Sequence, residues 1–301
     1  MTSRVLASAP AAPRSLVLPA LLACYLVWGS TYLAIRLALV SFPPFFEMGT
    51  RFLVAGAVLL AWVSSRGGRW PSAVQWRNAA VIGTLMLGLG MGLVASAEQH
   101  VGSGLVAAFI AVVPMLVCLW GLLAGRRPGR LELAGMCVGL AGVLLLVRGA
   151  GFAASPAAMA CMAGATLAWS LGSVLSTTRL PLAPGPAGFA SEMLCGGAGL
   201  LLASLALGEQ PHWPPQPLAA AAWLYLVGAG SLVAFSAYLY LLAHASPALA
   251  TSYAFVNPVI ALVLGVAFGG EAVSGAEWAA CAVILVGVGL IFRGKTASGR
   301  P

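Results

Sequence analysis

Residues 134–147 read AGMCVGLAGVLLLV, an apolar run without a charged side chain. The strands of a membrane barrel would alternate polar and apolar positions, so this run indicates a helix that crosses a lipid bilayer. The whole chain has the same character, because 61% of its 301 residues are hydrophobic, 7% are charged and the mean hydropathy is +0.99. A soluble domain carries about 25% charged residues. The chain is therefore predicted to be an all-α integral membrane protein.

Ten apolar blocks of this kind follow one another along the chain. A bilayer-spanning helix needs about 20 residues, and we place the predicted spans at 16–36, 45–65, 74–95, 102–123, 131–148, 156–177, 187–207, 218–241, 248–268 and 276–292. The tails and loops between them are too short to form a soluble catalytic or ligand-binding domain. The protein is thus expected to act within or across the membrane, with the lipid bilayer as its surroundings.

Basic side chains gather on one side of this arrangement. With the N-terminus in the cytoplasm, 12 of the 15 basic residues fall on the inner side, and Arg36, Arg51 and Arg148 fall on the outer side. The positive-inside rule favours this orientation, which places both termini in the cytoplasm. It also accounts for the net charge of +8 without a nucleic-acid partner.

The sequence lacks the usual signatures of catalysis and metal binding. The six cysteines lie in apolar spans without a CxxC pair, and the three histidines are widely separated. No HExxH or GxSxG motif is present. We therefore expect no catalytic residue, no metal and no cofactor, and an enzyme is disfavoured. A membrane scaffold or receptor without transport activity stays an alternative.

An internal repeat divides the chain. A shift of 141 residues places Trp28 on Trp169, and a shift of 144 residues aligns the fourth span with the ninth. These matches predict two halves, residues 1–149 and 150–301, with five helices each. Because each half crosses the membrane an odd number of times, the second half must be inverted relative to the first. Secondary transporters use such inverted repeats for alternating access to the two sides of a membrane.

Three stretches add a family resemblance to this reasoning. They are Trp28-Gly29-Ser30-Thr31-Tyr32, Pro43-Pro44 leading to Arg51-Phe52-Leu53, and Ser246-Pro247-Ala248-Leu249-Ala250 leading to Asn257-Pro258. Their order and spacing over nearly the whole chain resemble the EamA-type permeases of the drug/metabolite transporter superfamily. The resemblance implies ten transmembrane helices in two inverted five-helix repeats in a bacterial inner membrane. It is closest to bacterial exporters of small metabolites, some of which export amino acids.

Candidates for binding the substrate are polar, aromatic and thioether side chains near the centres of spans. Burying a polar group in lipid costs free energy, whereas a position along a water-filled cavity does not. The candidates are Trp28, Ser30, Met86, Met91, Phe109, Trp169, Ser170, Phe235, Tyr238, Tyr253 and Asn257. Each hydroxyl could instead bond back to its own helix, and each aromatic ring could instead pack between helices.

The charges suggest a substrate class and a mode of transport. The glutamates lie at or near the ends of spans, so no titratable group is expected at the membrane midplane, and we expect facilitated or weakly proton-linked flux. Only Arg51 and Glu192 could bring a charge to the substrate, and both could instead extend toward the membrane surface. This lining favours small neutral or zwitterionic solutes such as amino acids. Export of amphipathic drugs or toxic metabolites is the second choice, and a monomer and a homodimer are both left open.

Two prolines and an asparagine complete the predictions. Pro114 and Pro258 align under the 144-residue shift, and each is expected to kink its helix and act as a hinge for alternating access. Asn257 precedes Pro258 and lies one helical turn after Tyr253. Because Pro258 has no N–H, the Ala254 carbonyl loses its helical hydrogen bond, and the Asn257 amide could donate to that carbonyl instead. Alternatively, Asn257 and Tyr253 point into the cavity and bind the polar head of the substrate.

Overall fold

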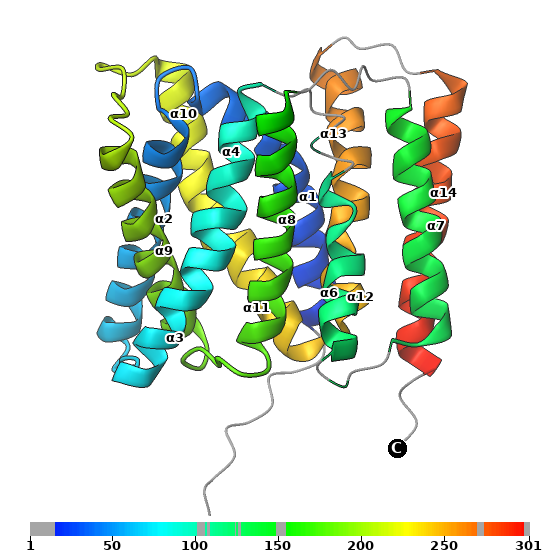
Figure 1. Cartoon of the computed structure of the whole chain (residues 1–301), viewed down its shortest axis with the longest axis horizontal. Coiled ribbons are helices and arrows are strands. Elements are labelled where there is room, and N and C mark those ends of the chain that lie inside the picture. The colour runs from blue at the N-terminus through cyan, green and yellow to red at the C-terminus, as the bar shows by residue number, and fades with distance from the viewer. Residues whose placement is uncertain are drawn as a thin grey trace, which may run out of the picture.

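The computed structural model describes residues 16–100, 106, 109–123, 125, 128–148, 155–269 and 274–297. This part of the chain folds into a bundle of helices that run roughly side by side, and it contains no strand (Figure 1). In the first half the helices are α1 Val17–Ala38, α2 Pro44–Ser65, α3 Ala73–Gly83, the π-helix η2 Thr84–Met91, α4 Gly92–Glu98, α6 Val113–Leu123 and α7 Arg130–Val147. In the second half they are α8 Pro156–Ser176, α9 Pro186–Ala206, α10 Pro217–Tyr225, the π-helix η3 Leu226–Phe235, α11 Ser236–His244, α12 Pro247–Ala250, α13 Tyr253–Gly269 and α14 Gly275–Ala297.

Proline and serine fix the starts of several helices. Pro44, Pro156, Pro186 and Pro217 lie in the first turns of α2, α8, α9 and α10, where a backbone without an N–H loses no helical hydrogen bond. Ser72 begins α3 with a capping box. The sequence therefore marks helix starts more sharply than the apolar runs alone would.

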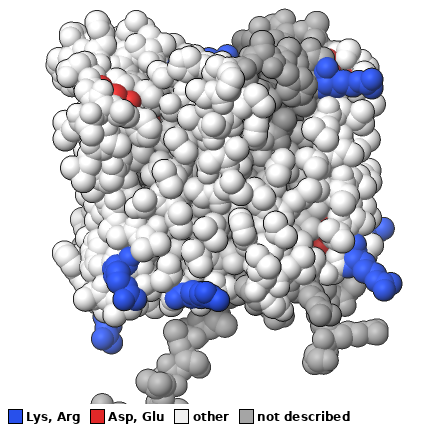
Figure 2. All heavy atoms as spheres, in the orientation of Figure 1, with Lys and Arg blue, Asp and Glu red and all other residues white. Residues whose placement is uncertain are grey.

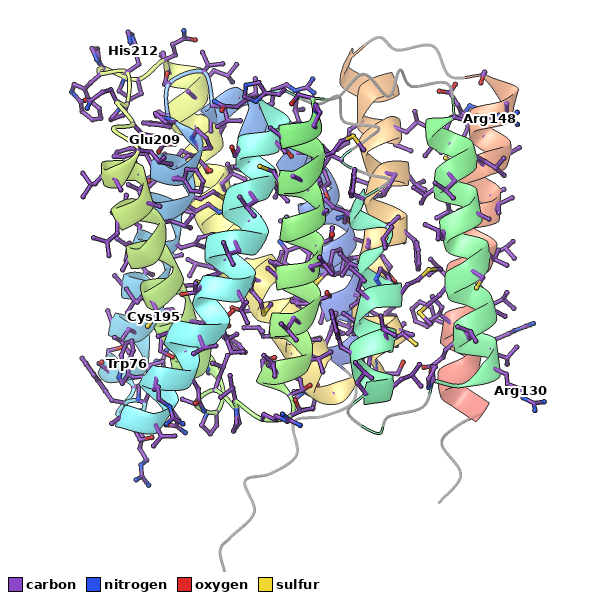
Figure 3. The ribbon with its side chains drawn as sticks, in the orientation of Figure 1. Trp76, Arg130, Arg148, Cys195, Glu209 and His212 are labelled. Atoms are coloured by element: carbon purple, nitrogen blue, oxygen red, sulfur yellow. The ribbon has the colours of Figure 1, made fainter. Side chains whose placement is uncertain are left out.

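The start of α2 is also held by the loop between α9 and α10. The Glu209 carboxylate accepts hydrogen bonds from the backbone N–H groups of Phe45 and Phe46 at 3.2 and 2.8 Å. Figure 3 labels Glu209 at this end of the bundle. These N–H groups have no partner within the helix, so a residue of the second half completes a helix of the first half.

Eight helices in the described part of the chain are long and apolar enough to cross a membrane. They cover eight of the ten predicted spans, and the continuous helices 73–98 and 217–244 include the π-helices. The shorter apolar helix α6 lies in the predicted span 102–123, part of which is outside the described residues, and α7 lies in the predicted span 131–148. The helical membrane architecture is confirmed, and the count of ten crossings stays a prediction.

Corresponding helices of the two halves run in opposite directions (Figure 1). In the view of Figure 3, α7 runs upward from Arg130 to Arg148, whereas α14 runs downward in Figure 1. α2 packs on its counterpart α9, and α7 packs on its counterpart α14. The contact of α1 with α13 has its counterpart in the contact of α8 with α6. This geometry is that of an inverted repeat, while the boundary between residues 149 and 150 stays a prediction.

Glycines let the two pairs of counterpart helices approach closely. A Cβ added at Gly287 in α14 would lie 2.5 Å from the backbone nitrogen of Gly139 in α7. A Cβ added at Gly197 in α9 would lie 2.9 Å from the backbone nitrogen of Leu53 in α2. Small residues at helix interfaces are typical of membrane bundles, because backbone packing replaces the hydrophobic effect there.

Basic side chains gather near the lower end of the bundle in the view of Figure 2, and few lie near its upper end. α1 begins and α14 ends at this lower end (Figure 1). The distribution agrees with the predicted orientation, in which this end faces the cytoplasm. Both the orientation and the cytoplasmic termini stay predictions.

Candidate functional site

The centre of the bundle is an aromatic cluster built from both halves. The rings of Trp28 in α1 and Trp169 in α8 lie 5.7 Å apart and nearly perpendicular. The Tyr253 ring of α13 lies 4.7 Å from Trp28. The Tyr238 ring of α11 lies 5.2 Å from Trp28 and 5.5 Å from Trp169. The two tryptophans that align in the sequence thus meet at the middle of the fold.

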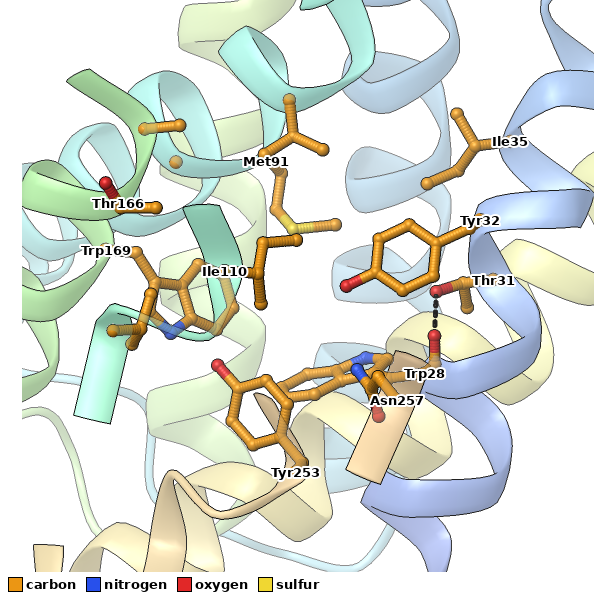
Figure 4. Close-up of a pocket in the computed structure, with 14 residues that line it drawn as sticks. Trp28, Thr31, Tyr32, Ile35, Met91, Ile110, Thr166, Trp169, Tyr253 and Asn257 are labelled. Carbon is orange, nitrogen blue, oxygen red and sulfur yellow. Dashed lines mark hydrogen bonds between the residues drawn. The ribbon is translucent and has the colours of Figure 1, made fainter. Parts of the chain in front are cut away.

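A cavity of about 60 Å³ lies beside this cluster. Figure 4 shows the side chains around it, which come from α1, η2, α4, α6, α8 and α13 and from the segment before α6. Five of the eleven candidate residues line the cavity, namely Trp28, Met91, Trp169, Tyr253 and Asn257. The other lining residues are Thr31, Tyr32, Ile35, Gly90, Val94, Ile110, Val113, Ala165 and Thr166.

Polar atoms in the cavity wall have unused hydrogen-bonding capacity. The indole N–H of Trp169 and the amide oxygen of Asn257 are buried and have no partner. In the structure the Asn257 side chain does not hydrogen-bond to the Ala254 carbonyl. Buried polar groups are normally hydrogen-bonded, so these two atoms leave hydrogen-bonding capacity unused in side chains that line the cavity.

Two serine candidates do not face the cavity. The Ser30 hydroxyl donates to the Val27 carbonyl at 2.8 Å and bonds to the Tyr225 hydroxyl at 2.6 Å. The Ser170 hydroxyl donates to the Leu167 carbonyl at 2.9 Å. Neither serine is among the residues that line the cavity, and a role for them in substrate binding stays a prediction.

Four further candidates also lie away from the cavity. Met86 is buried against Gly172 of α8, and Phe109 packs in a smaller apolar cluster. Phe235 is buried with its ring 6.2 Å from the Trp169 ring. Tyr238 packs beneath the lining rings, and its hydroxyl bonds to that of Ser173 at 2.8 Å. These side chains support the cavity wall instead of forming its surface.

A wide groove lies on the other side of Tyr238. It has a volume of about 940 Å³ and is bounded by the start of α1, the end of α8, the start of α9 and α11. Ser236 and Leu239, which flank Tyr238 in the sequence, both line it. Tyr238 thus lies next to residues that line the groove and against the cavity-lining rings of Trp28 and Trp169.

Sequence reasoning missed the two π-helices. η2 and η3 occupy the middles of the third and eighth predicted spans and overlap under the 144-residue shift. A Cβ added at Gly90 in η2 would lie 3.1 Å from the Trp169 ring, so this glycine lets the ring approach the backbone. The signal in the sequence is the glycine run Gly88, Gly90 and Gly92. π-helices are frequent at functional sites.

The two prolines differ in their settings. Pro258 lies inside α13, as predicted. Pro114 is the second residue of α6 and follows a turn at 111–112, so the prediction of a mid-helix kink there is wrong. A proline in a first turn removes no helical hydrogen bond. The interrupted backbone faces the cavity through Ile110 and Val113, and such backbone is tolerated at membrane depth where it lines a cavity.

Charged side chains penetrate deeper than the sequence suggested. Arg51 is 1% exposed, and its Nε donates to the Ser231 hydroxyl at 2.8 Å in the middle of the helix 217–244. Glu192 is 0% exposed, and both of its carboxylate oxygens lack a partner. Neither residue extends toward the surface. The expectation that the midplane holds no titratable group is therefore wrong, because helix packing carries Arg51 inward.

The comparisons with known proteins agree with this architecture. The EamA-like transporter family matches residues 15–148 and 156–293. The uncharacterized inner membrane transporter YedA of Escherichia coli strain K12 is 42% identical over 92% of this chain and 90% of its own length. Protein PecM of Dickeya dadantii is 28% identical over 88% of this chain and 86% of its own length.

A solved crystal structure has the same fold. It superposes with a TM-score of 0.77 at 27% identity and covers 96% of this chain and 100% of the other. Family matches in both halves, a full-length relative above 40% identity and a central cavity between inverted repeats lead to one assignment. This chain belongs to the EamA-like transporter family.

Proposed function

We propose that the protein is a secondary transporter in a bacterial inner membrane that exports small metabolites, most of all amino acids, by alternating access. The observation that carries the proposal is the cavity between the two inverted halves, flanked by the aligned Trp28 and Trp169. Inverted repeats with a binding site between them are the basis of alternating access in secondary transporters. The name of the E. coli relative, an inner membrane transporter, supports the same activity.

The cavity wall favours small neutral or zwitterionic solutes with an apolar side chain. Aromatic rings and aliphatic side chains form most of it, and Asn257, Thr31 and Thr166 add uncharged polar groups. Sugar phosphates and other polyanions need clustered lysines or arginines, and the cavity lining formed by the described residues contains neither. The described residues that line it include no carboxylate or histidine either, since Glu47 and Glu98 are buried outside this lining, and we propose facilitated or weakly proton-linked flux. The apolar wall would also suit amphipathic drugs, and their export is the second candidate function.

A liposome assay tests both the function and the role of Asn257. The purified chain is reconstituted and tested with the twenty labelled amino acids and a few cationic dyes, with and without a pH gradient. We expect saturable flux of apolar amino acids and no dye movement. In the Asn257→Val variant, which copies Val113 of the first half, the half-saturation concentration should rise about fivefold at unchanged thermal stability, because one hydrogen bond to a solute is worth about 1 kcal/mol.

Other outcomes of this assay would contradict the proposal in distinct ways. Saturable dye flux alone would favour drug export, and no flux of any solute would favour a scaffold or receptor. Strong accumulation against the substrate gradient driven by protons alone would exclude facilitated flux. Loss of stability with unchanged apparent affinity would show that Asn257 only supports its helix.

We also propose that Pro258 is a flexing point for alternating access. Its ring deprives the Ala254 carbonyl of a helical hydrogen bond, next to the cavity-lining Asn257. Pro258→Ala restores that bond and should lower the maximal flux severalfold while the amount of protein in the membrane is unchanged. Pro114→Ala is the matched control, and it should have the smaller effect because Pro114 lies in a first turn. Wild-type flux in Pro258→Ala would show that the proline is not a hinge.

A further inference from the structure

Four charged residues form a cluster between α1, α2 and α4, beside the cavity. The charged cluster consists of Glu47, Arg51, Glu98 and Arg36. Glu47 and Arg51 are fully buried, and the carboxylate oxygens of Glu98 are buried as well. Glu98 interacts electrostatically with each of the other three residues. Arg36 is exposed at the edge of the cluster.

The buried charges of the cluster are close but not bonded to one another. The four carboxylate oxygens of Glu47 and Glu98 have no hydrogen-bond partner. The side-chain hydrogen bonds of Arg51 go to the Ser231 hydroxyl at 2.8 Å and to the Met48 sulfur at 3.5 Å, not to a carboxylate. Glu47 lies in the first turn of α2, where the helix dipole offsets only part of the cost of burying its charge. The cluster therefore has donors and acceptors available to a ligand.

The cluster adjoins the cavity wall at two places. A Cβ added at Gly230 would lie 3.1 Å from Nη2 of Arg51 and 3.4 Å from Cγ2 of the cavity-lining Thr31. The Gly230 carbonyl accepts the indole N–H of Trp28 at 3.4 Å. Glu98 interacts electrostatically with Tyr32, which also lines the cavity. The Arg51 guanidinium thus lies close to Thr31 in the cavity wall, and Glu98 acts electrostatically on Tyr32 in the same wall.

The corresponding place in the second half lacks this chemistry. Under the shifts that align the repeats, Arg51 corresponds to Glu192, and Ser231 corresponds to Leu87, which is fully buried and apolar. The second half therefore keeps a buried charge at the position of Arg51, but with the opposite sign and without a counterpart of Ser231.

The charge balance selects the ligand. The four formal charges of the cluster sum to zero, so a zwitterion adds no net charge, whereas an anion or a cation would leave one uncompensated. We propose that the cluster binds the head of a zwitterionic substrate, with its carboxylate at Arg51 and Ser231 and its ammonium group at Glu98 and Glu47. The aromatic cavity then takes the apolar side chain. Charge-assisted hydrogen bonds of this kind are the stronger ones in proteins. This assignment rests on the proposed export of amino acids.

Competition in proteoliposomes tests the assignment. Flux of labelled L-phenylalanine is measured against 2-phenylethylamine, which lacks the carboxylate, and 3-phenylpropanoate, which lacks the ammonium group. In the wild-type protein each analogue should compete at least tenfold less well than L-phenylalanine. Arg51→Gln should raise the half-saturation concentration of L-phenylalanine at least tenfold and leave inhibition by 2-phenylethylamine unchanged. Glu98→Gln should have the converse selectivity, leaving inhibition by 3-phenylpropanoate unchanged.

Two charges at the outer ends of α7 and α14 provide matched controls. Arg148→Gln and Glu277→Gln remove one charge each outside the cluster and should leave all constants unchanged. If Arg51→Gln does not fold, Arg51→Lys and Ser231→Ala take its place in the competition assay. Each of them removes part of the hydrogen-bonding arrangement that would hold the substrate carboxylate.

The failure of this inference is distinguishable from failure of the proposed function. Equal losses for L-phenylalanine and both analogues in Arg51→Gln and Glu98→Gln would overturn the head-group site, while amino-acid transport by the wild type would stand. The absence of any amino-acid flux in the wild-type protein would overturn both.

Discussion

Gly90→Leu is expected to reduce transport at least tenfold in a protein that still folds. A Cβ at Gly90 would lie 3.1 Å from the Trp169 ring and 3.3 Å from the Leu85 carbonyl oxygen. The remaining carbons of a leucine would enter a cavity of about 60 Å³ or push the Trp169 ring out of its place. Overpacking of this kind costs about 1–3 kcal/mol, which a bundle of this size should tolerate. The measurement is amino-acid flux in proteoliposomes at matched protein content.

Gly88→Leu is the matched control for Gly90, in the same π-helix. A Cβ at Gly88 would meet only its own helix, with the nearest atom at 3.8 Å. Its flux should stay within about twofold of wild type, since no neighbouring element must move. Equal losses in the two variants would mean that the glycines serve the π-helix backbone and that Gly90 has no special role beside Trp169.

Gly287→Val is expected to give the largest loss of stability. A Cβ there would lie 2.5 Å from the backbone nitrogen of Gly139 and 2.8 Å from the backbone oxygen of Gly135. Backbone atoms cannot rotate away as a side chain can, so α7 and α14 must separate along their interface. We expect a loss of about 3 kcal/mol or more, at or above the upper end for overpacked cores. Thermal unfolding in detergent, followed by size-exclusion chromatography, measures it.

Gly289→Val on the same helix controls for the change in helix propensity. Nothing lies within 4 Å of a Cβ at Gly289, and the residue is exposed. Its unfolding temperature should match that of the wild type. A stable Gly287→Val variant would show that the α7–α14 contact adapts, and that close backbone packing is not required there.

The helical architecture follows from the sequence because lipid allows few alternatives. Backbone polar groups must be satisfied inside the chain, so long apolar runs such as residues 134–147 become helices whatever their neighbours are. The predicted odd number of crossings per half implies that the two halves run in opposite directions, as α7 and α14 do (Figure 1). The sequence alignment of Trp28 with Trp169 likewise singled out two residues, and their rings lie 5.7 Å apart in the structure.

Tertiary structure alone decided which face of each helix points to the cavity. Ser30 and Thr31 are adjacent, yet Thr31 lines the cavity while Ser30 bonds to Tyr225 on another face. One residue rotates a side chain by about 100° around a helix. A membrane helix is apolar on all sides, so its periodicity does not indicate which side faces the cavity.

The burial of charge was also a tertiary outcome. The sequence placed Arg51 and Glu192 near the ends of their spans, from which long side chains usually reach the surface. Packing of α2 against η3 instead directs Arg51 to Ser231, and packing of α9 encloses Glu192. The sequence by itself determined where helices run and how the halves are related, because these depend on local hydropathy and on the number of crossings. Which side chains share the cavity depended on contacts between distant helices, which hydropathy does not encode.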